Sequence, residues 1–134
     1  MTLLVDTSVW SLAFRRDVPP EIPHVSFLIR TIESGLSLVS TGLILQEILQ
    51  GFAGPKQRVA ILSRFAALPL VQPTRDDHVG AADLRNACRR VGAQLATIDA
   101  LLVQICITYG FTLLTTDKDF DSVPKGYRLK IWRP

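Results

Sequence analysis

The stretch from residue 97 to residue 120, TIDALLVQICITYGFTLLTTDKDF, constrains the fold of this chain more than any other. Its first half is almost continuously apolar, which predicts a mostly buried helix, with Thr97 as the expected cap. Gly110 is the residue type that ends a helix in the left-handed conformation. Residues 111–114 then predict a short buried strand, and an acidic turn follows. A helix, a glycine and a buried strand in this order indicate an α/β fold.

The lengths of these two elements bring their acids to one place. A helix of about eleven residues is roughly 16 Å long, and a strand of about five residues returns roughly the same distance. We therefore expect Asp99, at the helix start, and Asp117, after the strand, to lie at the carboxyl edge of the sheet. Open α/β sheets keep their sites at that edge. Carboxylates held close together repel one another unless a cation or a shared proton compensates.

The rest of the chain repeats the alternation of strand and helix, which predicts a largely parallel sheet with helices on both faces. We expect residues 1–134 to form a single domain, a three-layer α/β sandwich around a mostly parallel, five-stranded sheet. Pro69 and the alternating sequence YRLKIW predict that the third and fifth strands lie at the edges. The other four strands are expected at residues 2–5, 36–39 and 68–71 and, at the end of the chain, 127–132.

Composition narrows the class of protein. With 48% hydrophobic residues the chain is not disordered, and no apolar run reaches the roughly 18 residues that span a membrane. An acid at position 6 and the lack of a basic start argue against a signal peptide, so we expect a cytoplasmic protein with Cys88 and Cys106 reduced and buried. The net charge is +3 although half of the twelve acids are expected at one sheet edge. The remaining surface is then basic, which suits a polyanionic partner.

Four acids from separate parts of the sequence are expected to converge. Asp6 follows the first strand, and Glu47 lies nearly two turns into an apolar helix, from which its carboxylate can point back at the sheet edge. With Asp99 and Asp117, and with Asp119 and Asp121 expected nearby, they form an all-oxygen set that favours Mg²⁺ or Mn²⁺ over zinc. One ion or two at this place can activate a water to attack a phosphodiester. Taken singly, each acid also has an ordinary structural explanation as a helix-dipole, turn or surface residue.

Together these motifs resemble a PIN-domain protein, and specifically a VapC-type toxin of a type II toxin–antitoxin pair. The likeness runs essentially end to end. The position just before the last acid, often basic in that family, is Thr116 here. The matching segments are LLVDTSVW at 3–10, TGLILQEILQG at 41–51, TIDALL at 97–102 and LLTTDKDF at 113–120.

The resemblance implies an endoribonuclease that uses Mg²⁺ or Mn²⁺ to hydrolyse single-stranded RNA or exposed RNA loops. The implied catalytic and metal-binding acids are Asp6, Glu47, Asp99 and Asp117, with Asp119 as an auxiliary metal-binding acid. It also implies a homodimer, a cognate VapB-type antitoxin, and a hetero-oligomer of the two. Trp10 and Phe14 are candidates for the antitoxin groove or for the core, and Thr7, Ser8 and Thr115 are candidate hydroxyls around the acids. Candidate phosphate contacts are Arg15, Arg85, Arg89 and Arg90.

Three other classes share part of this pattern. A receiver-type signalling domain needs an acidic pair after the first strand, and a phosphatase with an aspartate nucleophile needs Asp-x-Asp there. The sequence Asp6-Thr7-Ser8 provides neither. A PIN scaffold that binds RNA or a protein without cleaving it remains the alternative to the nuclease.

Overall fold

The computed structural model describes residues 1–15 and 21–134, and it contains a five-stranded sheet in which every neighbouring pair of strands is parallel. The strand order is β3-β2-β1-β4-β5, so β3 and β5 lie at the edges as the sequence predicts. The strands are β1 (Leu3–Val5), β2 (Leu38–Thr41), β3 (Leu70–Val71), β4 (Thr112–Leu114) and β5 (Lys130–Ile131).

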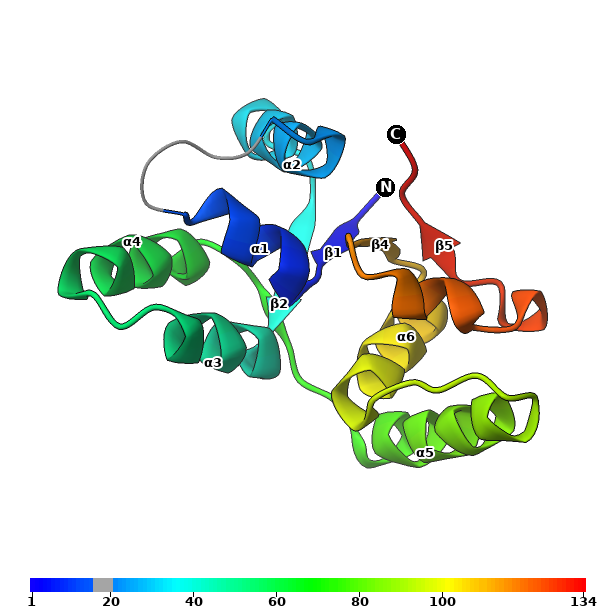
Figure 1. The fold of residues 1–134 in the computed structure, drawn as a ribbon. Helices are drawn as coiled ribbons and strands as arrows, with labels where there is room; N and C mark the ends of the chain where they lie inside the picture. Colours follow the sequence, from blue (N-terminus) through cyan, green and yellow to red (C-terminus); the bar gives the residue numbers. More distant parts are fainter. Residues whose placement is uncertain (16–20) are drawn as a thin grey trace.

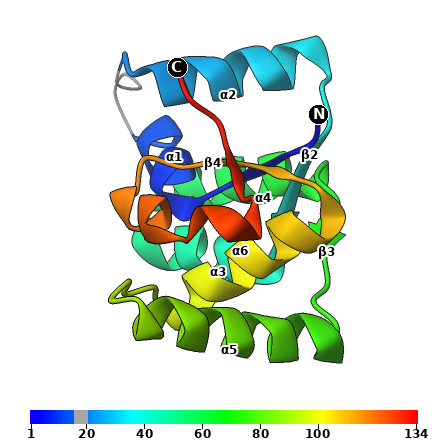
Figure 2. The same ribbon diagram turned by 90° about the vertical axis from the view of Figure 1, so that its right-hand side faces the viewer.

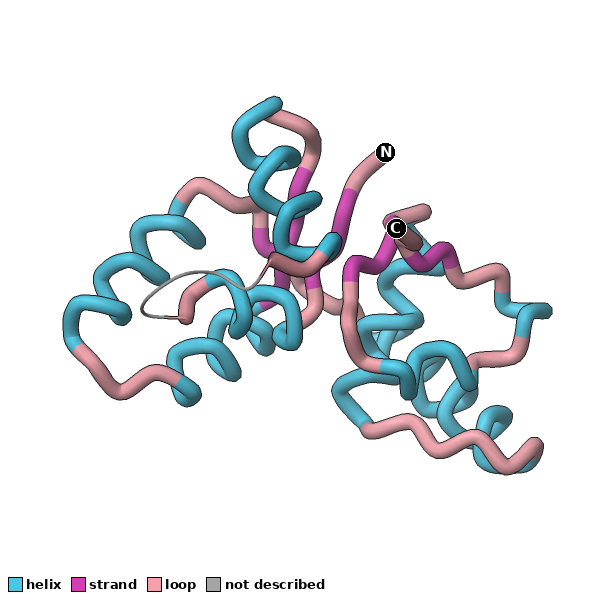
Figure 3. The backbone as a smooth tube through the Cα atoms, turned by 45° about the horizontal axis from the view of Figure 1, so that its top comes forward, coloured by secondary structure: helices cyan, strands magenta, loops and turns pink. Residues whose placement is uncertain are grey.

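Six α-helices in the described residues cover the two faces of this sheet, which confirms the three-layer α/β architecture. Figure 1 shows α1, α3 and α4 to one side of the strands and α5 and α6 to the other, and Figure 2 shows α2 and α5 at opposite ends of the molecule. The tube in Figure 3 shows the same short strands running between the two groups of helices. The helices are α1 (Thr7–Ala13), α2 (Pro23–Ser34), α3 (Gly42–Gly51), α4 (Pro55–Ala66), α5 (Arg75–Arg90) and α6 (Thr97–Tyr109).

The buried helix and strand predicted at residues 97–114 are α6 and β4. Gly110 ends α6 with φ 72°, in the left-handed region that glycine adopts without strain. Leu102, Val103 and Ile105 of α6 are fully buried, as is Leu113 of β4. Helix α6 therefore packs between α5 and strand β4. The expected cap at its start is wrong: Ala96 is the N-cap residue, and the Thr97 side chain makes no capping hydrogen bond.

Three strands are clearly shorter or later than predicted, for local reasons. Strand β3 starts two residues late because the Leu68 amide donates to Phe65 O (3.1 Å) and closes the end of α4. Strand β2 starts two residues late because the Leu36 amide donates to Thr31 O (3.2 Å) and closes the end of α2 after Gly35. Strand β5 is cut to two residues because Arg128 has φ 57°, which a strand cannot accommodate. A second 3₁₀ turn precedes it, so the chain has the 3₁₀ helices η1 (Lys118–Ser122) and η2 (Lys125–Tyr127).

The order of the strands fixes where a site should lie. The chain starts in the middle of the sheet with β1, continues to β2 and β3 on one side, and then returns to place β4 on the other side of β1. The direction of the connections therefore changes between β1 and β4, and in open parallel sheets ligands bind at the carboxyl ends of the strands at such a point. Asp6 follows β1 and the segment with Asp117 follows β4.

None of the helices in the described part of the chain has the length and apolar character needed to cross a bilayer. The two cysteines are buried and unpaired, on α5 and α6, as predicted.

Trp10 is 1% exposed and stacks on Phe14, with ring centroids 5.7 Å apart, and also packs against Phe65. Of the two roles considered for Trp10, the structure therefore supports core packing.

Candidate active site

Asp6 lies at the centre of a hydrogen-bond network where β1 and β4 end. The carboxylate is buried, and its Oδ2 accepts hydrogen bonds from Ser8 Oγ and Thr115 Oγ1, each at 2.9 Å. The Asp6 amide donates to Leu114 O (2.9 Å), which continues the β1–β4 pairing by one residue. The position of this acid is thus set by backbone and side chain together.

The same two hydroxyls hold the segment after β4. Ser8 Oγ accepts from the Thr116 amide (3.1 Å), and Thr115 Oγ1 accepts from the Asp117 amide (3.0 Å). Because each hydroxyl has one hydrogen and donates it to Asp6, the 3.3 Å approach of the two hydroxyl oxygens adds no further donor. Asp6 and the backbone of Asp117 are therefore joined through one shared set of contacts.

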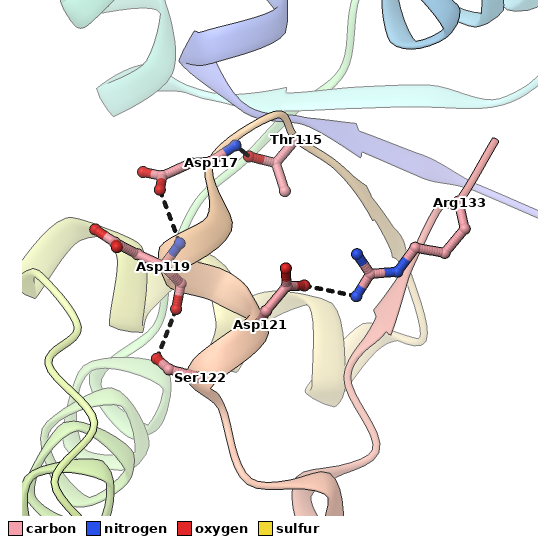
Figure 4. Close-up of polar contacts among 6 residues, drawn as sticks. All are labelled: Thr115, Asp117, Asp119, Asp121, Ser122 and Arg133. Carbon is pink, nitrogen blue, oxygen red and sulfur yellow. Dashed lines mark hydrogen bonds and ion pairs between the residues drawn. The ribbon is translucent and has the colours of Figure 1, made fainter.

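The segment after β4 sends its acids in different directions. Asp117 precedes η1 and its Oδ1 accepts from the Asp119 amide (2.9 Å), while Ser122 Oγ donates to Asp119 O (2.6 Å). Figure 4 shows the carboxylates of Asp117 and Asp119 on one side of the turn, whereas Asp121 extends toward Arg133. The Asp121–Arg133 ion pair is 2.6 Å long. Asp121, which is predicted near the acids, pairs with this arginine and also lines a small pocket together with Asp117.

Glu47 reaches the same edge from the neighbouring helix. Thr41 caps α3, its side chain accepting from the Ile44 amide (3.2 Å). Glu47 is partly buried on that helix, and its Oε1 accepts from Thr7 Oγ1 at 2.7 Å. Since Thr7 follows Asp6 directly, this bond ties α3 to the end of β1. The carboxylate therefore points at the sheet edge, as predicted from the tilt of helical side chains.

Asp99 completes the group from the first turn of α6, where the helix dipole favours a negative charge. Burial first, and the negative charges of neighbouring acids second, together raise the pKa of this carboxyl group to about 6. The acids responsible are, in order of effect, Asp6, Asp117, Glu47 and Asp119. The other four predicted site acids therefore all lie close enough to act on Asp99, although the roles of the five stay predictions.

The donor set of this cluster fits a hard divalent cation. It consists of carboxylates and hydroxyls, the oxygen ligands that Mg²⁺ and Mn²⁺ prefer, without cysteine or histidine. Within residues 1–15 and 21–134, the one ion pair is that of Arg133 with Asp121, so no lysine or arginine neutralises the five acids. In the described residues, no group of three or more Asp, Glu, His or Cys side chains is arranged so that it could hold a metal ion. The acids thus gather negative charge without forming a finished coordination shell.

Sequence motifs predict the acids but not the hydrogen bonds that connect them. The same motifs predict Thr7, Ser8 and Thr115 as hydroxyls near the acids, and the structure places all three in hydrogen bonds to Asp6 or Glu47. The double role of Ser8 and Thr115, which also accept backbone amides from the segment after β4, was missed. The signal available in the sequence was a hydroxyl residue beside the acid in both DTS and TTD.

Comparison with known proteins agrees with this architecture. The chain matches the PIN domain family over residues 3–126, while no curated protein matches its sequence. Similar solved structures include VapBC2 from Rickettsia felis bound to a promoter DNA fragment (TM-score 0.77, 16% identity, covering 98% of each chain). Others are DNA-bound VapBC from Salmonella typhimurium (TM-score 0.75, 14% identity, 98% of this chain and 97% of that one) and Mycobacterium tuberculosis VapC20, described as a sarcin-ricin loop cleaving toxin (TM-score 0.67, 17% identity, 90% and 94%).

At such low identity these structures establish a shared fold only, and the match over residues 3–126 establishes the family. That match covers nearly the whole chain and includes every predicted site acid from Asp6 to Asp119. The parallel sheet, the change of direction between β1 and β4, and the acids gathered there are therefore features of a PIN domain, and the chain belongs to the PIN domain family.

Proposed function

We propose that this protein is a Mg²⁺- or Mn²⁺-dependent endoribonuclease and the toxin of a type II toxin–antitoxin pair. The observation that carries the proposal is the raised pKa of Asp99, to about 6, in a cluster of carboxylates that no basic side chain of the described residues neutralises. Such a cluster is costly for the fold unless a cation joins it. Membership of the PIN domain family and a fold like that of VapC20, a sarcin-ricin loop cleaving toxin, support the same function.

The site residues would have two roles: the acids would hold the cation, and the hydroxyls hold the acids in position. Asp6, Glu47, Asp99 and Asp117 would hold the cation, and Asp119 would assist at the rim. When bound, the cation lowers the pKa of a coordinated water and stabilises charge on the leaving oxygen of the phosphodiester. Ser8 and Thr115 keep Asp6 and the Asp117 backbone in place, so less reorganisation is needed when the substrate arrives.

The partner of this toxin would be a VapB-type antitoxin. The R. felis and S. typhimurium structures are VapBC complexes bound to DNA, which supports a hetero-oligomer of toxin and antitoxin. We also propose a homodimer and a cytoplasmic location for this chain. A short reading frame for a DNA-binding protein directly upstream of the gene, whose product co-purifies with this chain, is the expected finding.

Cleavage of a single-stranded RNA by the purified chain tests the catalytic proposal. We expect cleavage with Mg²⁺ or Mn²⁺, none with EDTA, and none from Asp6→Asn or Asp99→Asn. Asp83→Asn is the matched control, because Asp83 is an exposed acid on α5 whose charge does not act on Asp99. RNA that binds but stays intact with every divalent ion would contradict the nuclease and support the alternative, a non-cleaving PIN scaffold.

A further inference from the structure

A cavity of about 490 Å³ lies beside the acid cluster and is not explained by the metal site. It is lined by Arg85 and Arg89 of α5, by residues 93–96 between α5 and α6, and by Asp119. Asp119, in η1, therefore lines the same cavity as the connection between α5 and α6. Since Asp119 is also one of the acids that raise the pKa of Asp99, the cavity borders directly on the candidate active site.

The two arginines give this cavity a positive wall. Arg85 is partly buried and its Nε donates to Leu95 O (2.9 Å), which fixes the guanidinium while leaving its other four N–H groups for a ligand. Arg89 lies four residues later and therefore on the same helix face. Neither is in the one ion pair found in residues 1–15 and 21–134. One lining carboxylate, that of Asp119, faces two guanidinium groups, so the cavity carries net positive charge.

A nuclease with an acidic centre needs such a region. The carboxylates that hold the cation repel the phosphates of the same RNA strand, and a positive flank offsets this repulsion. Arginine suits this task because its planar fork can make two parallel hydrogen bonds to one phosphate. The volume also lies within the range of about 300–1,000 Å³ that is usual for ligand sites.

We propose that this cavity binds a backbone phosphate of the RNA strand, adjacent to the phosphodiester that is cut, through Arg85 and Arg89. The inference rests on the proposed ribonuclease function and adds a location for the substrate. Arg90, which was predicted together with them, does not line the cavity. The arginines are binding and positioning residues, so their loss should raise KM more than it lowers kcat.

Salt-dependent binding tests the proposal. The Asp99→Asn background prevents cleavage, and Asp99 makes no side-chain hydrogen bond within the described residues, so this change disturbs the site little. The dissociation constant of a fluorescent single-stranded RNA is measured against salt from about 50 to 200 mM with and without Arg89→Gln. We expect Arg89→Gln to lower the slope of log Kd against log salt by about 0.7, the value for one phosphate contact on a single strand.

Arg90→Gln is the matched control, because it removes the same charge from the neighbouring position of α5, outside the cavity. It should change the slope clearly less. Equal changes from Arg89→Gln and Arg90→Gln, or an unchanged slope for Arg89→Gln, would overturn the proposed phosphate site while leaving the nuclease intact. Failure of the unmodified chain to cleave RNA with divalent ions would overturn both, so the two failures are distinguishable.

Discussion

Replacing Asp99 by asparagine should stabilise the ion-free protein at neutral pH. Asparagine has nearly the same shape as aspartate and carries no charge. Burial and four neighbouring carboxylates raise the pKa of Asp99 from 3.8 to about 6. The folded state therefore binds this proton more tightly than the unfolded state, and the free energy of unfolding falls as pH rises from about 4 to about 6. Above that range the ionised Asp99 lowers the free energy of unfolding by a constant amount, and Asp99→Asn removes this destabilisation.

The size of the effect follows from the shift. A rise of about two in the pKa of Asp99 corresponds to a free energy of roughly 3 kcal/mol at most. Because the side chain is only half-buried, solvent and salt screen about half of this energy. We expect Asp99→Asn to raise the free energy of unfolding by about 1–1.5 kcal/mol near pH 7, and the melting temperature by roughly 3–6 °C. Near pH 4, where the folded aspartate is already protonated, the variant and the parent should be equally stable.

Urea unfolding in EDTA at both pH values measures this difference. The control is Asp83→Asn, which changes an exposed acid that does not act on Asp99 and should change stability little at either pH. Adding Mg²⁺ should then reverse the order at neutral pH, since an ion at a hundred times its dissociation constant stabilises the parent by about 2.7 kcal/mol. A variant that is less stable than the parent in EDTA near pH 7 would refute the clustering of charge around Asp99.

Three other substitutions test the supports of the site. Thr115→Val removes the hydroxyl that donates to Asp6 and accepts from the Asp117 amide, and it should lower stability by about 1–3 kcal/mol and also lower cleavage. Thr116→Val is the control: the Thr116 side chain makes no hydrogen bond in the described residues, so this change should leave cleavage nearly unchanged. Thr41→Ala should lower stability by about 1 kcal/mol through loss of the α3 cap, and Thr41→Ser should restore it. Tyr109→Phe removes the hydroxyl that donates to Asp77 (3.0 Å). The hydrogen bond from the Thr74 backbone lowers the pKa of Asp77 most, and the hydrogen bond from Tyr109 also lowers it. Tyr109→Phe should therefore lower the free energy of unfolding in urea at neutral pH, and the difference should fade in acid, where Asp77 becomes protonated.

The sequence was enough to predict the layers because hydrophobic periodicity and glycine stops are local signals. The buried helix α6, its end at Gly110 and the edge positions of β3 and β5 all follow from such signals. The bounds of short strands do not, since they depend on which neighbour takes the backbone hydrogen bonds. Leu36 was predicted as strand, but its amide closes the preceding helix instead. Arg128 was predicted as strand, but its left-handed conformation delays β5.

The candidate site shows the same division between local and non-local information. Placing Asp6 and Asp117 at one edge needs only the parallel alternation of strands and helices, so the sequence predicts it. The ion pair of Asp121 could not be foreseen, because its partner, Arg133, lies twelve residues later in the sequence. The hydroxyl network could not be foreseen either, since Ser8 and Thr115 become partners only when β1 and β4 pair.

That network explains how a small sheet tolerates an acidic centre without an ion. Asp6 is buried, and its Oδ2 receives two hydroxyl donors, so this carboxylate is hydrogen-bonded within the fold. Asp99 receives no such donor in the described residues, and it is the acid whose pKa is raised to about 6. Burial and the neighbouring carboxylates thus favour the protonated form of Asp99, so this group can take up a proton when no cation is bound and release it when one binds. This arrangement lets the fold form before the ion arrives, and it predicts that ion binding releases a proton from Asp99 below about pH 6.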